Sequence, residues 1–331
     1  MDNFYHFSLK ALRKIIGYTS LSYKPEMLSL TLQSPDEASE YIYRLLISDK
    51  PCMVARYGST ELLAICNFLG ILSKKHSWWK FVTGKQLQWW WNRESLNQLQ
   101  KYSGFFPVTT INVAEFCGLM LHCSREIDLL GSWITNESHV KSYLQNAQKC
   151  KLRDLEPFWS QRPWSRALAN KKVVVVHPFA ETIELQYKEN RTRLFANKEV
   201  LPEFSSLRTV KAVQSLGGGN GEFHNWFEAL RWMENEIDKE DYDVCLIGCG
   251  AYGFPLAAHV KRMGKKAVHL GGALQLLFGI KGRRWEDPNY GVEKWGIPYG
   301  SYLNLMNEYW VRPSNVEKPK SANNVENACY W

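Results

Sequence analysis

The chain has 331 residues, of which 45% are hydrophobic and 22% charged, so it can bury the core of one large α/β domain or two small ones. No stretch approaches the ~20 apolar residues of a membrane-spanning helix, and the net charge of +8 includes no basic run long enough for a nucleic-acid-binding tail, which leaves small anionic ligands or an acidic membrane surface as partners. The eight cysteines are scattered without a Cys-x-x-Cys pair, so we expect buried reduced thiols, no cysteine metal site and a cytoplasmic protein.

Residues 1–50 are predicted to form a helical segment ahead of the main domain. A basic amphipathic helix at the start of this segment can rest on a membrane, at the inner face if the protein is cytoplasmic. We expect its apolar face to pack on the domain instead. Four aliphatic residues share one helical face and three basic residues lie between them: Leu9, Leu12, Ile15 and Ile16, with Lys10, Arg13 and Lys14.

Residues 51–310 alternate between short apolar runs rich in β-branched residues and helical patterns such as 59–70 and 223–237. This order predicts an α/β, Rossmann-like domain with a mostly parallel sheet and helices on both faces. Such sheets bind ligands beyond the carboxyl ends of their strands. The tail, 311–331, lacks periodicity but ends in aromatic residues, so we expect an extended segment packed on the domain. The predicted strands are 52–58, 126–133, 172–178, 207–213, 242–248 and 266–272.

Arg56 is a charged residue at the end of the otherwise apolar first strand. The chain then turns through Gly58, and a helix is predicted to begin near Ser59, with Ser59 or Thr60 as its cap and Glu61 in its first turn. An ordinary capped helix explains the last three residues. It does not explain Arg56, which lies where a parallel sheet holds its ligands.

A second candidate stretch begins at His177, which ends a very apolar strand. Glu181 and Glu184 follow, and then Arg191 and Arg193. An arginine can hold a phosphate with two hydrogen bonds. His177 can act as a catalytic base or as a hydrogen-bonded structural residue, and the sequence leaves both open.

Residues 248–253 read Gly-Cys-Gly-Ala-Tyr-Gly, between an apolar strand and an amphipathic helix. A turn of this kind offers backbone N–H groups to an anion. A dinucleotide site also needs an acidic residue after the next strand, and the chain has His269-Leu270-Gly271 there. We therefore favour a nucleotide or sugar over NAD or FAD, with a purely structural turn as the alternative.

Two aromatic stretches remain, 77–91 with five tryptophans and 272–285 with Arg283 and Arg284. The tryptophans can stack on sugars or meet a lipid interface, and a structural cluster explains them equally well. The paired arginines can face an anionic group, but adjacent arginines in a surface loop are usually solvated.

The chain resembles the GT-D-type glycosyltransferases of bacterial surface-polysaccharide and glycoprotein assembly. Their hallmark is a strand that leads into R-[FY]-G-D-x-E, and residues 56–61 read Arg-Tyr-Gly-Ser-Thr-Glu, with Ser59 at the Asp position. The strand–turn–helix–strand unit at 243–272, the stretch 177–195 and the ending 325–331 are also similar to members of this group. The resemblance spans roughly residues 50–331.

The resemblance implies a Rossmann-like fold and a nucleotide-sugar donor, with a UDP-sugar favoured. The sugar would pass to a glycan or lipid-linked oligosaccharide in surface polysaccharide or glycoprotein assembly, and no nucleic acid would be bound. The donor contacts would be Arg56, Tyr57, Gly58, Ser59, Arg191, Arg193, Gly248, Gly250, Tyr252 and Gly253.

The catalytic candidates are Glu61, His177 and Glu181. In metal-using members of the family, two carboxylates of the motif hold a divalent cation. Glu61 alone is left here to bind Mn²⁺ or Mg²⁺, so arginines can stabilise the leaving diphosphate instead. Two other functions stay open: an NAD-dependent nucleotide-sugar enzyme, and a non-catalytic scaffold that binds glycan or membrane.

Overall fold

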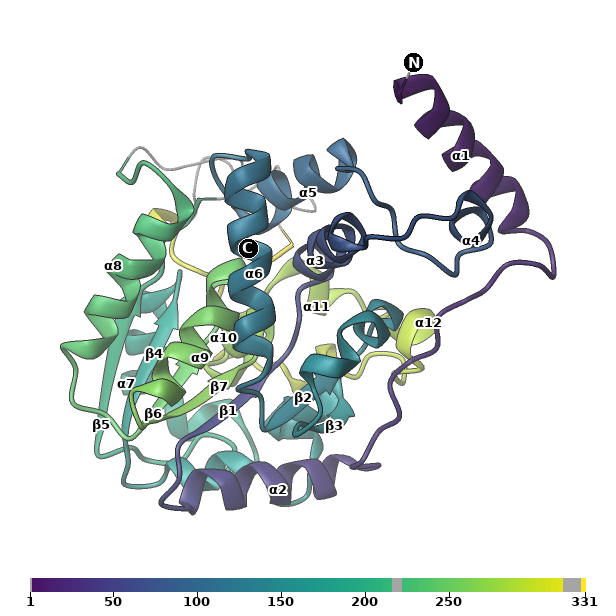
Figure 1. The fold of residues 1–331 in the computed structure, drawn as a ribbon. Coiled ribbons are helices and arrows are strands. Elements are labelled where there is room, and N and C mark those ends of the chain that lie inside the picture. The colour runs from purple at the N-terminus through teal and green to yellow at the C-terminus, as the bar shows by residue number, and fades with distance from the viewer. Residues whose placement is uncertain (1, 216–221, 318–328) are drawn as a thin grey trace.

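A computed structural model describes residues 2–215, 222–317 and 329–331. Its centre is a seven-stranded sheet with the order β3-β2-β1-β7-β6-β4-β5, in which all neighbouring strands are parallel (Figure 1). The predicted α/β, Rossmann-like fold is therefore confirmed. The strands are β1 (Cys52–Ala55), β2 (Leu129–Ser132), β3 (Gln148–Lys151), β4 (Lys172–His177), β5 (Ser206–Lys211), β6 (Val244–Ile247) and β7 (Lys266–His269).

Strand β3 is the one strand of this sheet that the sequence did not predict. Three of its four residues are polar, and only Cys150 is buried. It forms an edge of the sheet and pairs with β2 alone. Because an edge strand is open to solvent along one side, it needs no continuous apolar run and gives no such signal.

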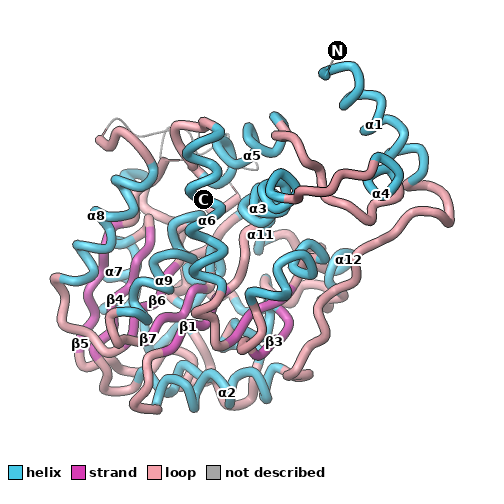
Figure 2. The backbone as a smooth tube through the Cα atoms, in the orientation of Figure 1, coloured by secondary structure: helices cyan, strands magenta, loops and turns pink. Residues whose placement is uncertain are grey.

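Helices cover both faces of the sheet, as predicted (Figure 2). Val174 and Val176 of β4 contact the core with α3, α6, α8 and α9, whereas Val173 and Val175 contact the core with α2, α7 and α10. This alternation follows from the two-residue repeat of a strand. The helices are α1 (Asp2–Ile16), α2 (Pro35–Ile47), α3 (Ser59–Leu72), α4 (Trp78–Val82), α5 (Arg93–Ser103), α6 (Thr110–Ser124), α7 (Ala180–Leu194), α8 (Trp226–Asp238), α9 (Gly253–Arg262), α10 (Leu274–Leu277), α11 (Arg283–Glu286) and α12 (Val292–Trp295).

Helix α1 does not pack on the sheet domain, contrary to expectation. It packs on α4, and the two helices project together from the body (Figure 1). Leu9 of α1 joins Phe81 and Val82 of α4 in a small separate cluster. No helix in the described ranges is long and apolar enough to cross a membrane.

The described parts of the tail lie on the domain. Val311 forms a parallel bridge with Ile280, and Cys329 and Trp331 are buried. The predicted extended segment also includes residues 318–328, which lie outside the described residues. All eight cysteines are buried, as expected for reduced thiols, and no disulfide joins any of them within the described residues.

Candidate functional site

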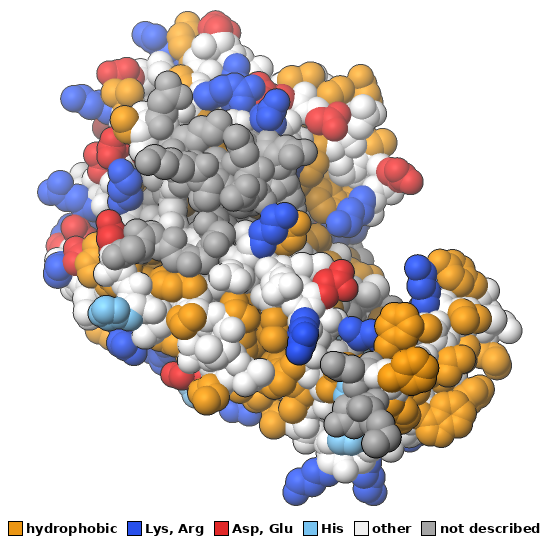
Figure 3. Space-filling view, turned by 90° about the horizontal axis from the view of Figure 1, so that it is seen from above, with side chains coloured by type: hydrophobic (Ala, Val, Ile, Leu, Met, Phe, Trp, Pro, Cys, Tyr) orange, Lys and Arg blue, Asp and Glu red, His pale blue; other side chains and the backbone are white. Residues whose placement is uncertain are grey.

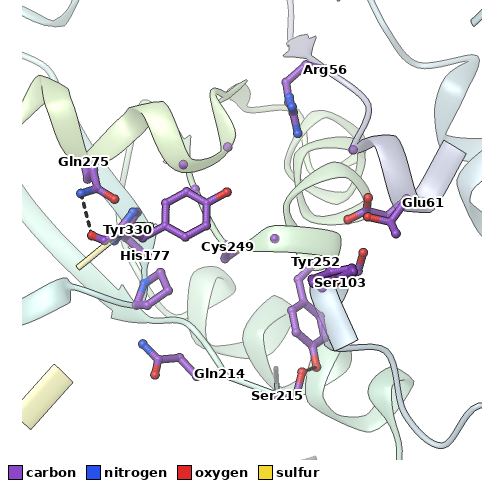
Figure 4. Close-up of a pocket in the computed structure, with 18 of the residues that line it drawn as sticks. Arg56, Glu61, Ser103, His177, Gln214, Ser215, Cys249, Tyr252, Gln275 and Tyr330 are labelled. Carbon is purple, nitrogen blue, oxygen red and sulfur yellow. Dashed lines mark hydrogen bonds between the residues drawn. The ribbon is translucent and has the colours of Figure 1, made fainter. Parts of the chain in front are cut away.

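A pocket of about 210 Å³ opens at the carboxyl edge of the sheet (Figure 4). Arg56 follows β1, His177 ends β4, Gly248 follows β6 and Gly271 lies after β7, and all four line the pocket. Helix α7 leaves β4 toward one face of the sheet, whereas α9 leaves β6 toward the other. The pocket therefore lies at a topological switch point, where open α/β sheets bind ligands.

The Arg56 guanidinium is half-buried in this pocket and lies 5.0 Å from the ring centroid of Trp133. Among the described residues it makes no hydrogen bond and no ion pair within 4.0 Å. Trp133 is held in place because its Nε1 donates to the Tyr57 carbonyl over 3.0 Å and its backbone N–H donates to Glu137 Oε1 over 3.2 Å. The ring thus positions a cation whose hydrogen-bond donors face the cavity.

Arg284 brings a second guanidinium to the same pocket. Its Nη1 donates to the Tyr330 hydroxyl over 3.3 Å, and its backbone N–H donates to the Cys329 carbonyl over 3.1 Å. Burial lowers the pKa of Arg56, and the positive charge of Arg284 lowers it further, while Glu61 opposes both effects. Two like charges in one pocket favour an anionic ligand between them.

Glu61 brings a carboxylate to the pocket lining, and it is only 7% exposed. Burial raises its pKa, whereas Arg56 and nearby hydrogen bonds lower it. The side chain folds back over Gly58, where an added Cβ would overlap Glu61 Oε2, so glycine leaves the space that the carboxylate occupies.

Gly58 is also the N-cap of α3, without a side-chain cap, so the predicted cap at Ser59 or Thr60 is wrong. Ser59 and Thr60 line the pocket instead.

His177 is buried in the pocket wall, and its Nδ1 accepts a hydrogen bond of 3.0 Å from the Phe179 backbone N–H. A neutral ring whose Nδ1 accepts carries its proton on Nε2. Burial lowers the pKa of His177 to about 3, so the ring is neutral near pH 7. It can donate from Nε2, but this tautomer cannot accept a proton there. The predicted role of His177 as a base is therefore not supported.

The glycine turn after β6 lines the pocket between His177 and Glu61. A Cβ on Gly248 would lie 2.7 Å from the Gly271 carbonyl oxygen, and Gly250 has a φ of +60°. Tyr252 lines the pocket, and its hydroxyl lies 2.8 Å from Ser215 Oγ (Figure 4). The turn therefore brings two glycines, Gly248 and Gly250, to the cavity, where the lack of a side chain lets a ligand approach the backbone closely.

Five predicted site residues lie outside the pocket lining. Tyr57 points into the core, where its hydroxyl donates to Ser124 Oγ over 2.6 Å. Gly253 is needed for packing, since a Cβ there would overlap the His269 ring. The other three are on α7, whose direction carries its side chains away from the sheet edge. Glu181 pairs with Lys211 at 3.0 Å, Arg191 pairs with Glu203 at 3.3 Å, and Arg193 lies 5.1 Å above the Tyr309 ring.

Several residues that line the pocket were not among the site residues predicted from the sequence. Trp133 follows β2, so its position after a strand was a usable signal, but Arg284 and Tyr330 come from outside the strand–helix pattern. Gln275 is 1% exposed, and its Nε2 donates to the Tyr330 carbonyl over 3.2 Å (Figure 4). Within the described part of the chain, Gln275 Oε1 has no hydrogen-bond partner. It is therefore a buried acceptor beside the cavity.

These residues do not make a good site for Mn²⁺ or Mg²⁺. Hard cations prefer several oxygen ligands, but the described lining of the pocket offers one side-chain carboxylate, Glu61, beside the Arg56 guanidinium. Across residues 2–215, 222–317 and 329–331, no three His, Cys, Asp or Glu side chains lie close enough together to hold a metal ion. The Arg56 and Arg284 side chains are thus the cationic groups with which the described lining of the pocket can bind an anion.

Comparison with family models, with curated proteins and with solved structures finds no match to this chain.

Proposed function

We propose that the pocket binds the diphosphate of a nucleotide-sugar donor and that the protein transfers the sugar to a glycan or lipid-linked oligosaccharide. The observation that carries this proposal is the pair of guanidinium groups, Arg56 and Arg284, in one pocket with Gly248 and Gly250. Arg56 has no ion-pair partner among the described residues, so its donors are available to a phosphate. Stabilisation of the charge that develops on a leaving group usually contributes more to such catalysis than any other single effect.

In the proposed reaction, the bond between the anomeric carbon and the diphosphate oxygen breaks, and the diphosphate leaves with the electron pair. The acceptor hydroxyl oxygen bonds to the anomeric carbon and loses its proton to Glu61. Burial raises the pKa of Glu61, which makes the carboxylate a stronger base. His177 donates from Nε2 to the donor and does not take up the proton.

The remaining lining suits the uncharged parts of the donor. Tyr102, Phe179, Tyr330 and Trp331 supply aromatic surface on which a base or a sugar can stack. Gln275 Oε1, which has no partner within the described chain, can accept from a sugar hydroxyl or a base N–H. We favour a UDP-sugar as donor. An NAD-dependent enzyme is less well supported, because His269 at the end of β7 and residues 270–273 after it include no carboxylate for the ribose.

A thermal-shift screen of the full chain against nucleoside diphosphates and nucleotide-sugars tests the donor assignment. A ligand at a hundredfold excess over its Kd stabilises the native state by about 2.7 kcal/mol, which gives a measurable rise in melting temperature. We expect UDP or a UDP-sugar to give the largest rise. If no nucleoside diphosphate raises the melting temperature, the donor site is disproved.

A transfer assay with and without EDTA then tests catalysis. Release of nucleoside diphosphate and formation of a glycosylated acceptor, both insensitive to EDTA, are expected. If a nucleotide-sugar binds but its sugar is transferred to none of the acceptors, the result would instead support the scaffold alternative. Activity lost with EDTA and restored by Mn²⁺ would contradict the arginine-based mechanism while keeping the transferase function.

A further inference from the structure

Helix α1 has two apolar faces, and within the described chain one of them is covered while the other is not. Leu9 is buried against Phe81 and Val82, and Ile16 packs against the same cluster. The other face runs along residues 4, 7, 11 and 15, which helical geometry places in one row. The exposed fractions of its large side chains are 78% for Phe4, 69% for Phe7 and 64% for Ile15, and Tyr18, just after the helix, is 84% exposed.

Helix α4 adds two more exposed aromatic residues to this projecting part of the molecule. Trp78 is 55% exposed and Trp79 is 49% exposed. We call α1 and residues 73–92 the aromatic arm. Figure 3 shows hydrophobic side chains gathered on the projection at its lower right. Large apolar side chains that are grouped and uncovered mark an interaction surface.

The aromatic arm is also strongly basic. Helix α1 and residues 73–92 contain seven basic residues and one acidic residue, Asp2. Most of their basic side chains are exposed, although Arg13 is held inside the arm, where Nη1 donates to the Gln86 carbonyl over 3.3 Å. The seven basic residues are Lys10, Arg13, Lys14, Lys74, Lys75, Lys80 and Lys85.

We propose that the aromatic arm docks the protein on an anionic lipid surface, with α1 lying in the interface. Its exposed rings and aliphatic side chains would enter the boundary between headgroups and acyl chains, and its lysines would meet the lipid phosphates. With 15 residues, α1 is too short to span a bilayer, which takes roughly 20.

A second copy of the chain is a poorer partner for this surface. Two arms brought together would place basic side chains against basic side chains, because each arm has seven basic residues and only one acidic residue, Asp2. An anionic lipid surface matches both the apolar residues and the charge.

Vesicle sedimentation of the full chain tests the proposal. We expect the protein to pellet with vesicles that contain about 30% phosphatidylglycerol, to pellet much less with pure phosphatidylcholine, and to be released by high salt. The double variant Phe7→Ser/Ile15→Ser should reduce partitioning at least roughly tenfold, because two apolar side chains leave the interface. The matched control is Ile111→Ser, since Ile111 is 78% exposed on α6, outside the arm, and should pellet like the wild type.

A second pair of variants tests the charge. Lys14→Gln/Lys75→Gln should weaken binding to anionic vesicles, whereas Lys171→Gln/Lys188→Gln, which removes the same charge from outside the arm, should not. The proposal is overturned if the wild type stays in the supernatant with anionic vesicles, or if both arm variants, shown to be folded by circular dichroism, pellet like the wild type. It is also overturned if light scattering without vesicles shows a wild-type dimer that Phe7→Ser/Ile15→Ser converts to a monomer.

Discussion

The pocket and the aromatic arm are built from the same residue types but use them in opposite ways. In the pocket, cations lie on ring faces inside the protein: Arg56 is 5.0 Å from the Trp133 ring and Arg284 is 4.7 Å from the Tyr330 ring. In the arm, large rings such as Phe4 are open to solvent among exposed lysines. A basic, aromatic composition therefore does not identify a ligand; burial decides whether it suits a small anion or an extended anionic surface.

The largest expected effect concerns the Arg56 cation of the pocket. Arg56→Ala should weaken binding of a nucleoside diphosphate at least about 100-fold, or about 2.7 kcal/mol, because a charge-assisted contact in a half-buried site is lost. The melting temperature of the free protein should change little, since Arg56 has no ion pair to lose among the described residues. Isothermal titration calorimetry measures the affinity, and Arg191→Ala is the matched control because Arg191 lies outside the pocket lining. Equal losses of affinity in both variants would show that Arg56 does not contact the bound nucleoside diphosphate.

A second prediction concerns the close packing around Gly248, which lines the pocket. Gly248→Ala should destabilise the protein by roughly 2 kcal/mol, because the new Cβ would meet the Gly271 carbonyl oxygen at 2.7 Å and that atom belongs to the backbone. Gly118→Ala, in the middle of α6 with no atom within 4 Å of the added Cβ, should instead stabilise by up to about 1 kcal/mol. Denaturant unfolding of both variants measures the contrast. Unchanged stability in Gly248→Ala would mean that the turn packs more loosely than these contacts indicate.

A third prediction uses the pH dependence of stability. Burial lowers the pKa of His177 to about 3, below the ~6.5 of an unfolded histidine. Between these values the unfolded state binds the extra proton, so His177 costs stability as the pH falls from 7 toward 3. At about pH 5 the cost is about 2 kcal/mol relative to pH 7. His177→Gln should therefore lose less stability than the wild type over this range, as measured by denaturant unfolding. Parallel pH curves would show that the ring is not buried in its neutral form.

The smallest effect is expected in the arm. Phe7→Ala should leave the free energy of unfolding within about 0.5 kcal/mol of the wild-type value, because its side chain is 69% exposed and has little contact to lose. Leu9→Ala, two residues away and 4% exposed, should loosen α1 from α4. Hydrogen exchange of the α1 amides should increase in Leu9→Ala and stay unchanged in Phe7→Ala. Similar exchange in both variants would contradict the burial of one face of α1 and the exposure of the other.

The sequence by itself determined the fold class and part of the pocket lining. Six runs rich in apolar and β-branched residues predicted six strands, and charged or glycine residues at their ends predicted Arg56, Gly58, His177 and Gly248 at one edge. Glu61 followed from its position in the first turn after that edge. Local pattern and a general property of parallel sheets are sufficient to place these residues.

Only the tertiary structure decided which residues from other segments line the pocket and which of the predicted residues do not. Arg284 and Tyr330 arrive from segments without strand–helix periodicity, and α7 directs Glu181, Arg191 and Arg193 away from the edge that the neighbouring His177 lines. The protonation of His177 also depends on a backbone donor and on burial, neither of which a sequence displays. The physical reason is the same throughout: the charge state and the direction of a side chain are set by neighbours in space, and those neighbours are distant along the chain.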